Sequence, residues 1–116
     1  MLAMHEMSVT MSLLDLVLEE ASKAGAGKIT GVNIVLGEMT GIIDHYVQAN
    51  FELLSQNTPA EGAELSFQNI PRQARCRNCA HPFQPTDFEW ACPKCQSSEI
   101  EITGGSELYV ESIEVE

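Results

Sequence analysis

The chain has 116 residues, 44% of them hydrophobic, and a formal net charge of −11 at neutral pH. This length and apolar content predict one folded domain, or one small domain with a smaller module, and exclude a disordered chain. The negative charge argues against nucleic acid or an anionic membrane as the partner. It suits a cationic partner or a metal ion.

The charge is unevenly distributed along the chain. Residues 71–104 carry four basic and four acidic residues, whereas the rest of the chain carries Lys23 and Lys28 against 13 acids. We therefore expect two regions: an acidic α/β domain made of residues 1–70 and 105–116, and a nearly neutral domain of residues 71–104.

No targeting or membrane segment is evident in the sequence. The N-terminus lacks a basic region, acidic residues interrupt its apolar positions, and no apolar run approaches the ~20 residues that a membrane span needs. We therefore expect a cytoplasmic protein that does not bind membranes.

The first predicted element is a helix. Apolar residues recur at helical spacing at Val9, Leu13, Leu16, Val17 and Ala21. We expect the helix to run from about Ser8 to Ala24, with Ser8 as its N-cap and Gly25 and Gly27 ending it.

A strand, a helix and two more strands follow. ITGVNIVLG (29–37) and ELSFQNI (64–70) alternate like strands, and Asp44 is placed to cap a helix that directs Val47, Phe51 and Leu54 inward. In the last segment the apolar alternation slips by one residue between Val110 and Ile113, which predicts a β-bulge or a change of packing partner.

These elements predict an α/β (α+β) fold. We expect a small mixed three-stranded sheet with two helices, and a zinc-ribbon module inserted before the last strand.

All four cysteines lie in two CxxC pairs, CRNC (76–79) and CPKC (92–95), separated by twelve residues. Two such turns direct Cys76, Cys79, Cys92 and Cys95 at one point, which is the tetrahedral geometry that zinc takes. With no cysteine left over the site is closed, so we expect a structural rather than a catalytic Zn(II). Two disulfides, a rubredoxin-like iron site and a thioredoxin-like redox pair are alternatives that the spacing leaves open.

The second candidate metal site lies at Met4-His5-Glu6. A chain that begins Met-His-Glu offers its α-amine, backbone nitrogens and the His imidazole to one ion, a donor set that suits square-planar Ni(II) or Cu(II). A histidine in the first turn of a helix is also commonly just solvated, and the residues alone leave both interpretations open.

The whole chain, from Met4 to Glu116, resembles the HypA/HybF family of nickel metallochaperones of nickel-iron hydrogenase maturation. The resemblance rests on the MHE start, VNIVLGEMTGI, PAEGAEL, the two CxxC pairs and the terminal GGSELYVESIEVE, in that order. It implies that His5 is the principal Ni(II) ligand, that Met4 and Glu6 supply main-chain donors, and that the four cysteines hold Zn(II).

The resemblance also implies partners: a GTPase of nickel insertion, and the large-subunit precursor of a nickel-iron hydrogenase as acceptor. A homodimer is an option that the sequence leaves open. Family members begin at Met-His-Glu, whereas Met1-Leu2-Ala3 precede it here. If those residues persist, Met4 has no free amine and the chelate loses one donor.

The remaining chemistry-bearing residues give weaker signals. His81 follows the first cysteine pair and is either a solvated loop histidine or an extra nickel donor. The sequence has no nucleophile triad, phosphate loop or defined carboxylate pair, so we expect no enzymatic activity. The alternative function is a zinc-ribbon protein-interaction module with no role in nickel binding.

Overall fold

A computed structural model describes residues 2–86 and 88–116, without the side chains of residues 2–5. The elements follow in the order α1 (Leu2–Lys23), β1 (Ile29–Gly37), the 3-10 turn η1 (Glu38–Thr40), α2 (Asp44–Leu54), β2 (Glu64–Ile70), β3 (Gln73–Cys76), β4 (Pro82–Phe83), β5 (Ile100–Gly104) and β6 (Leu108–Val115). None of the described helices is long and apolar enough to cross a membrane.

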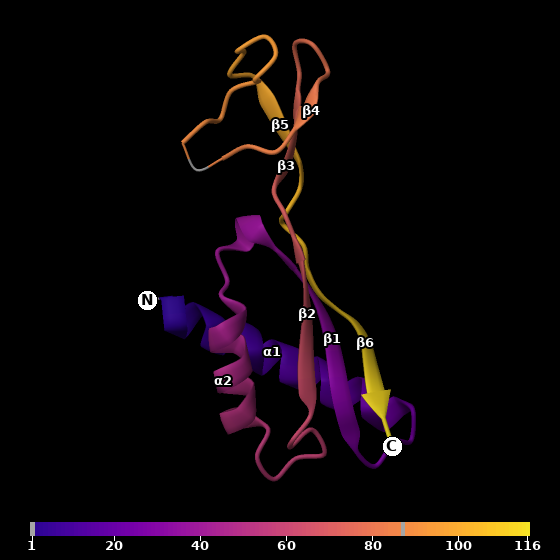
Figure 1. The fold of residues 1–116 in the computed structure, drawn as a ribbon. Helices are drawn as coiled ribbons and strands as arrows, with labels where there is room; N and C mark the ends of the chain where they lie inside the picture. Colours follow the sequence, from indigo (N-terminus) through magenta and orange to yellow (C-terminus); the bar gives the residue numbers. More distant parts are fainter. Residues whose placement is uncertain (1, 87) are drawn as a thin grey trace.

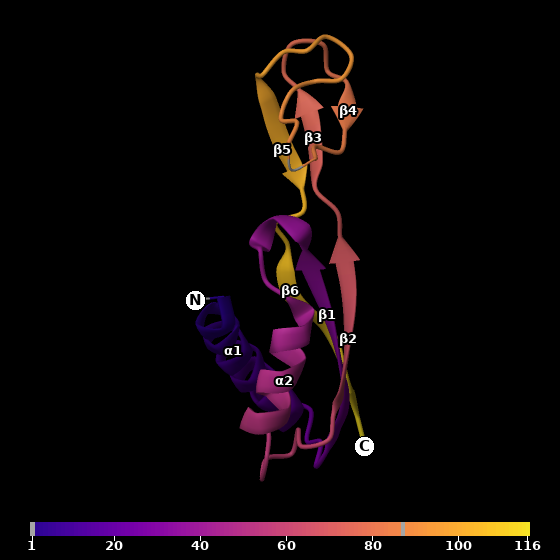
Figure 2. The ribbon, with the colours of Figure 1, turned by 60° about the vertical axis from the view of Figure 1, so that its left-hand side comes forward.

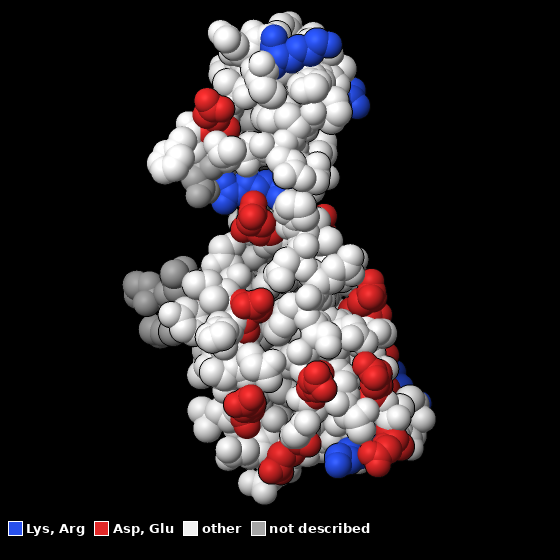
Figure 3. Space-filling model, viewed as in Figure 1, with Lys and Arg blue, Asp and Glu red and all other residues white. Residues whose placement is uncertain are grey.

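The molecule is elongated, with principal extents of 55 × 30 × 16 Å, and each end is built on its own sheet (Figure 1). We call residues 2–70 and 105–116 the body, and the described residues of 71–104 the cysteine lobe. The acidic side chains in view lie mostly on the body, and the top of the lobe carries basic ones (Figure 3).

The sheet of the body has the strand order β2-β1-β6. β1 pairs parallel with β2 and antiparallel with β6, so the sheet is mixed, as predicted. Both helices lie on one face of this sheet (Figure 2). The α+β fold with two helices and a small mixed three-stranded sheet is thereby confirmed, and the second sheet, of strand order β4-β3-β5, is antiparallel.

A single apolar core lies between the two helices and the sheet. Its fully buried members include Val17 of α1, Ile29 and Val32 of β1, and Val47 and Phe51 of α2. Gly25 ends α1 in the left-handed conformation, at φ 69°, and the Ala26 N–H then reaches back to the Ala21 carbonyl. This is the Schellman arrangement, for which glycine is suited because it has no Cβ.

The start of α1 differs from the prediction. The helix begins at Leu2 rather than near Ser8, so Ser8 is an exposed residue within the helix and not its N-cap. Leucine, alanine and methionine are strong helix formers, and they extend the helix toward the N-terminus. Leu16 was expected in the core but is 41% exposed, whereas Leu14 and Thr10 are buried.

The predicted bulge in the last strand is confirmed. Ser112 pairs with Asn33 and Val110 pairs with Ile34, so Glu111 has no partner on β1. The prediction for Asp44 is wrong in detail, because Ile43 occupies the N-cap position of α2 without a side-chain cap and Asp44 is the first helical residue.

Two segments of the chain join the body to the cysteine lobe, one between β2 and β3 and the other between β5 and β6. At this junction the N–H groups of Gly37 and Met39 donate to the carbonyls of Glu107 and Gly105, both at 2.6 Å. The Glu38 carboxylate accepts from the Arg72 guanidinium at 2.8 Å. The backbones approach so closely here that Gly37 has no room for a Cβ, which would overlap the Gly105 carbonyl.

Gly37→Ala is therefore expected to destabilise the junction. The added methyl meets backbone rather than a flexible side chain, so the free energy of unfolding should fall by about 1–3 kcal/mol or more. Gly27→Ala is the matched control, because nothing lies within 4 Å of a Cβ at that position. Urea denaturation of both variants checks this, and equal free energies of unfolding would contradict it.

Candidate metal centre

The first CxxC pair forms a tight turn at the end of β3. The Ala80 N–H donates to the Cys76 carbonyl at 2.9 Å, and the Cys76 N–H donates to the His81 carbonyl at 3.0 Å. Ala80 takes the left-handed conformation, at φ 66°, and reverses the chain. Cys76 is buried and Cys79 is exposed.

The second CxxC pair forms a turn with the same two backbone hydrogen bonds as the first. The Gln96 N–H donates to the Cys92 carbonyl at 2.7 Å, and the Cys92 N–H donates to the Ser97 carbonyl at 2.9 Å. Gln96 is left-handed, at φ 63°, Cys92 is buried and Cys95 is exposed. Two equivalent turns therefore face each other, each with one buried and one exposed sulfur.

The four sulfurs converge on one point. All lie within 4.8 Å of one another, with Cys76 to Cys95 at 3.5 Å and Cys79 to Cys92 at 3.6 Å. The backbone N–H groups within each turn point at the first sulfur of that turn, at 3.3–3.5 Å. The four cysteines are free thiols in this structure, not disulfides.

These contacts shift the acidities of the thiols in opposite directions. The Cys79 N–H is the main reason that the pKa of Cys76 is lowered to about 7. At Cys79 the His81 N–H lowers the pKa, but burial and the neighbouring thiols together outweigh it and raise the pKa to about 11. Burial raises the pKa of Cys92, yet the N–H groups of its own turn and the nearby thiols outweigh it, so this pKa is lowered.

A divalent cation fits this arrangement. Four thiolates this close repel one another, and a bound cation supplies the charge that lets all four ionise. Tetrahedral zinc with Zn–S bonds of about 2.3 Å needs sulfurs about 3.8 Å apart, which is close to the separations found. The four cysteines are thus positioned to hold a metal ion, and they are the one group of three or more such side chains found among the described residues.

The second candidate site lies at the start of α1. The backbone of Met4, His5 and Glu6 is helical, while the side chains of Met4 and His5 lie outside the described part of the structure. The Glu6 side chain is fully buried, and its Oε2 accepts from the Ile43 N–H at 2.8 Å. This carboxylate oxygen therefore ties the start of α1 to the start of α2, while the other oxygen, Oε1, is buried without a hydrogen-bond partner among the described residues.

Removing the Glu6 carboxylate is expected to destabilise the body. Glu6→Ala leaves the Ile43 N–H without its acceptor and opens a buried space, so the free energy of unfolding should fall by about 2–3 kcal/mol. Glu6→Gln keeps an oxygen in place and should recover most of the loss. Glu20→Ala, at an exposed position of the same helix, is the control and should change little. Urea denaturation checks all three; a Glu6→Ala protein as stable as Glu20→Ala would contradict the role assigned to Glu6.

His81 is half-buried, and its ring stacks on Phe83 with the centroids 6.5 Å apart. Its carbonyl belongs to the first cysteine turn, but its imidazole is not among the clustered metal-binding groups. A role for His81 as a nickel donor stays a prediction. Sequence reasoning missed the buried carboxylate of Glu6, since no pattern marks a single acid on an inward position.

Comparison with known proteins shows which family this chain is similar to. A family model described as hydrogenase/urease nickel incorporation, metallochaperone, hypA matches residues 4–115. Among the relatives, the hydrogenase maturation factor HypA of Caldanaerobacter subterraneus subsp. tengcongensis is 45% identical over 97% of this chain and 100% of that one. The corresponding factor of Dehalococcoides mccartyi is 43% identical over 97% of this chain and 95% of its own.

Two solved structures of HypA proteins are similar to this chain over nearly its full length. The solution structure of a HypA protein superposes with a TM-score of 0.72 at 32% identity, covering 97% of this chain and 96% of that one. The solution structure of the Ni metallochaperone HypA from Helicobacter pylori gives a TM-score of 0.64 at 29% identity, covering 95% and 96%. The resemblance drawn from the sequence motifs is confirmed, and the chain belongs to the HypA family of nickel-incorporation metallochaperones, which are not enzymes.

Proposed function

We propose that this protein carries Ni(II) at Met4-His5-Glu6 and delivers it during maturation of a nickel-iron hydrogenase. The observation that carries the proposal is the family match, which begins at Met4 and runs to the end of β6. The His5 imidazole is the one side-chain donor of the site. Met4 and Glu6 contribute main-chain nitrogen, in keeping with a Glu6 carboxylate that is already engaged by Ile43.

The residue at which the chain begins determines whether these main-chain nitrogens are free to bind nickel. In an α-helix each N–H beyond the first turn is bonded to a carbonyl four residues earlier, and only the first four N–H groups lack such a partner. In the 116-residue chain, α1 begins at Leu2, so the Glu6 amide lies within this bonding pattern. In a chain that starts at Met4, the amides of His5 and Glu6 fall in the unbonded first turn and are free to bind nickel.

We assign the four cysteines to a structural Zn(II) that holds the cysteine lobe together. Zinc supplies the positive charge and the tetrahedral frame for four thiolates. Residues 71–104 then act as a zinc-dependent domain, and the body acts as the nickel-binding domain. The two equivalent turns and the converging sulfurs support this assignment.

The acceptor is, on this proposal, the large-subunit precursor of a nickel-iron hydrogenase. The family description names hydrogenase and urease, and the relatives compared above are named hydrogenase maturation factors. The sequence has no phosphate-binding loop, so any energy input comes from a partner, and the family resemblance implies that this partner is a GTPase. On this proposal the protein works in the cytoplasm, which its membership of a family of maturation factors supports.

Nickel titration of two chains tests the nickel site. The chain that starts at Met4 should bind Ni(II) about 10–100-fold more tightly than the 116-residue chain, or about 1.4–2.8 kcal/mol. It should also show a stronger square-planar absorption band, because its α-amine and free amides complete the in-plane set. Equal affinities and identical spectra would exclude the α-amine as a ligand. Zinc binding without any nickel binding by either chain would favour a docking module instead.

A further inference from the structure

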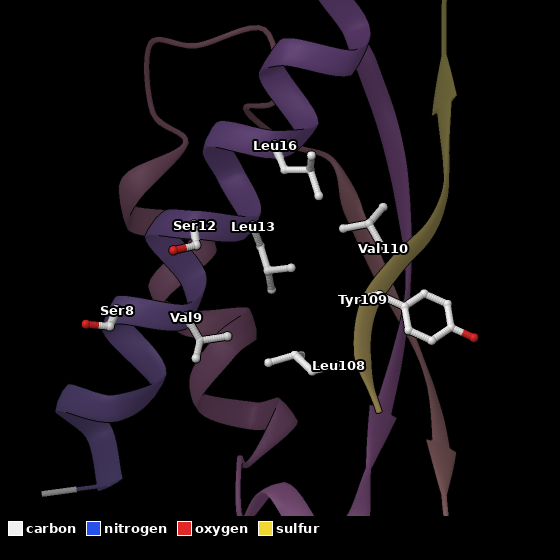
Figure 4. Close-up of a pocket in the computed structure, with 8 residues that line it drawn as sticks. All are labelled: Ser8, Val9, Ser12, Leu13, Leu16, Leu108, Tyr109 and Val110. Carbon is white, nitrogen blue, oxygen red and sulfur yellow. The ribbon is translucent and has the colours of Figure 1, made fainter. Parts of the chain in front are cut away.

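An apolar groove runs between α1 and β6 at one edge of the body. Val9, Leu13 and Leu16 from α1 and Leu108 and Val110 from β6 point into the space between the two elements (Figure 4). The cavity measures about 430 Å³. A neighbouring cavity of about 270 Å³ shares two of these residues, so the groove continues along the helix.

The groove is open to solvent. Leu16 is 41% exposed and Leu108 is 36% exposed, whereas Leu13 at its floor is 8% exposed. Fully burying an apolar side chain stabilises a protein by about 1.5–3 kcal/mol relative to leaving it exposed. The neighbouring leucines of the groove lack part of this stabilisation while they face solvent. A cluster of this kind marks a surface that a ligand covers.

β6 forms the rim of the groove and also the edge of the sheet. It pairs with β1 on one side, and no described strand pairs with its other side. The free N–H and C=O groups of an edge strand are the template to which an extended segment adds by main-chain hydrogen bonds. Tyr109 points away from the groove, so alternate residues of β6 face it, as strand geometry requires (Figure 4).

The surroundings of the groove are acidic. Glu20 of α1 and Glu111 of β6 line it, and two more acidic residues, Glu114 and Glu116, follow at the C-terminal end of the chain. Lys23 lies near the acidic end of α1, but it is paired with Glu19 and Glu20 at 3.4 and 3.8 Å. A segment that enters this groove therefore meets apolar walls and a negative rim.

We propose that the groove between α1 and β6 binds an extended, basic segment of a partner protein as an added strand beside β6. Alternate apolar side chains of the segment lie between α1 and β6, and the Lys or Arg residues between them face the other side of the sheet, where the Glu114 carboxylate lies beside Asn33. This inference does not depend on nickel binding.

Charge decides between a partner protein and a second copy of this chain. The body carries 13 acids against Lys23 and Lys28, so the strands of a second copy would bring more acidic side chains to an acidic rim. Pairing two β6 strands would set their glutamates against each other. A basic segment, in contrast, is attracted by the negative charge of the body.

Synthetic peptides test the proposal on the full-length, zinc-loaded protein. The probe is a short fluorescent peptide of alternating lysine and valine, and its control has the same composition with all valines in one run. Fluorescence anisotropy should show that the alternating peptide binds at least about 10-fold more tightly. Hydrogen exchange should slow at amides of β6. Methylating alternate peptide nitrogens should remove the binding, because the strand hydrogen bonds are lost.

Variants locate the binding on the protein. Leu16→Gln and Leu108→Gln should each weaken binding of the alternating peptide about 10-fold. Leu53→Gln, at a 60% exposed position of α2 outside the groove, should leave it unchanged. The thermal transitions of all three variants establish that they are folded. Two groove variants are used so that the test still holds if one of them does not fold.

Three results would overturn the proposal. Equal affinity for the two peptides would show attraction by net charge alone. Equal loss in Leu53→Gln and in the groove variants would place the binding elsewhere. Sedimentation showing a dimer that Leu16→Gln dissociates would assign the groove to a second copy.

Discussion

Cys92→Ala is expected to unfold the cysteine lobe while the body stays folded. Cys92 is 1% exposed, and its sulfur lies 3.6 Å from that of Cys79 and accepts two backbone N–H groups of its own turn. Removing it leaves three thiolates for the metal. Structural zinc sites contribute about 10–16 kcal/mol of coupled folding and binding free energy, and much of this would be lost.

The lobe has little else to hold it together. Among its described residues the buried positions are Ala74, Pro85 and the cysteines Cys76 and Cys92, whereas Trp90 and Phe88 are exposed. The body has its own core, made by α1, α2 and the β2-β1-β6 sheet. Loss of the metal site should therefore not propagate far beyond the junction at Gly37 and Gly105.

Amide hydrogen exchange followed along the chain measures this prediction. Exchange in residues 71–104 should become fast in Cys92→Ala, and exchange in α1 and β1 should remain slow. Gln84→Ala, an exposed position in the lobe, is the control and should match the parent protein. Equal loss of protection in both regions would contradict the division of the chain into two domains.

His5→Ala is expected to abolish nickel binding without changing the zinc content. Its imidazole is the one side-chain donor in the proposed chelate, so nickel affinity should fall at least about 100-fold, or roughly 2.7 kcal/mol. Nickel binds only the neutral form of an imidazole. Affinity of the parent protein should therefore fall as the pH is lowered below about 6.5, where histidines in general take up a proton.

Calorimetric titration with nickel checks this result, with two histidine controls. His45→Ala, at an exposed position of α2, should leave the nickel isotherm unchanged. His81→Ala separates the two roles left open for that residue: a weakened isotherm identifies it as an extra donor, and an unchanged one as a loop histidine stacked on Phe83. An unaltered isotherm in His5→Ala would end the hypothesis of a nickel site at Met4-His5-Glu6.

The strands and the inserted module could be predicted because their signals are local. The ITGVNIVLG alternation gave β1 with the correct bounds, and the one-residue slip after Val110 gave the bulge at Glu111. The spacing of the two CxxC pairs predicted that four sulfurs would converge, and they do. In each case the periodicity or the spacing already encodes the geometry.

Which residues of α1 are buried could not be predicted, because tertiary contacts decide it. Glu6 was expected to supply only a main-chain donor to the nickel site, yet its carboxylate is buried against the Ile43 N–H, which lies 37 residues away along the chain. Leu16 fits the helical periodicity of a core residue, but β6 does not close over it, and it lines a groove instead. No local pattern distinguishes an apolar residue of the core from one of an open groove.

X-ray absorption at both metal edges tests the two-site claim most directly. The 116-residue protein and the chain starting at Met4 are each loaded with one equivalent of zinc and one of nickel. We expect zinc to be bound by four sulfurs at about 2.3 Å, and nickel to be bound by nitrogen and oxygen donors that include an imidazole. Sulfur in the nickel shell, fewer than four sulfurs around zinc, or iron in place of zinc in the protein as isolated would contradict it.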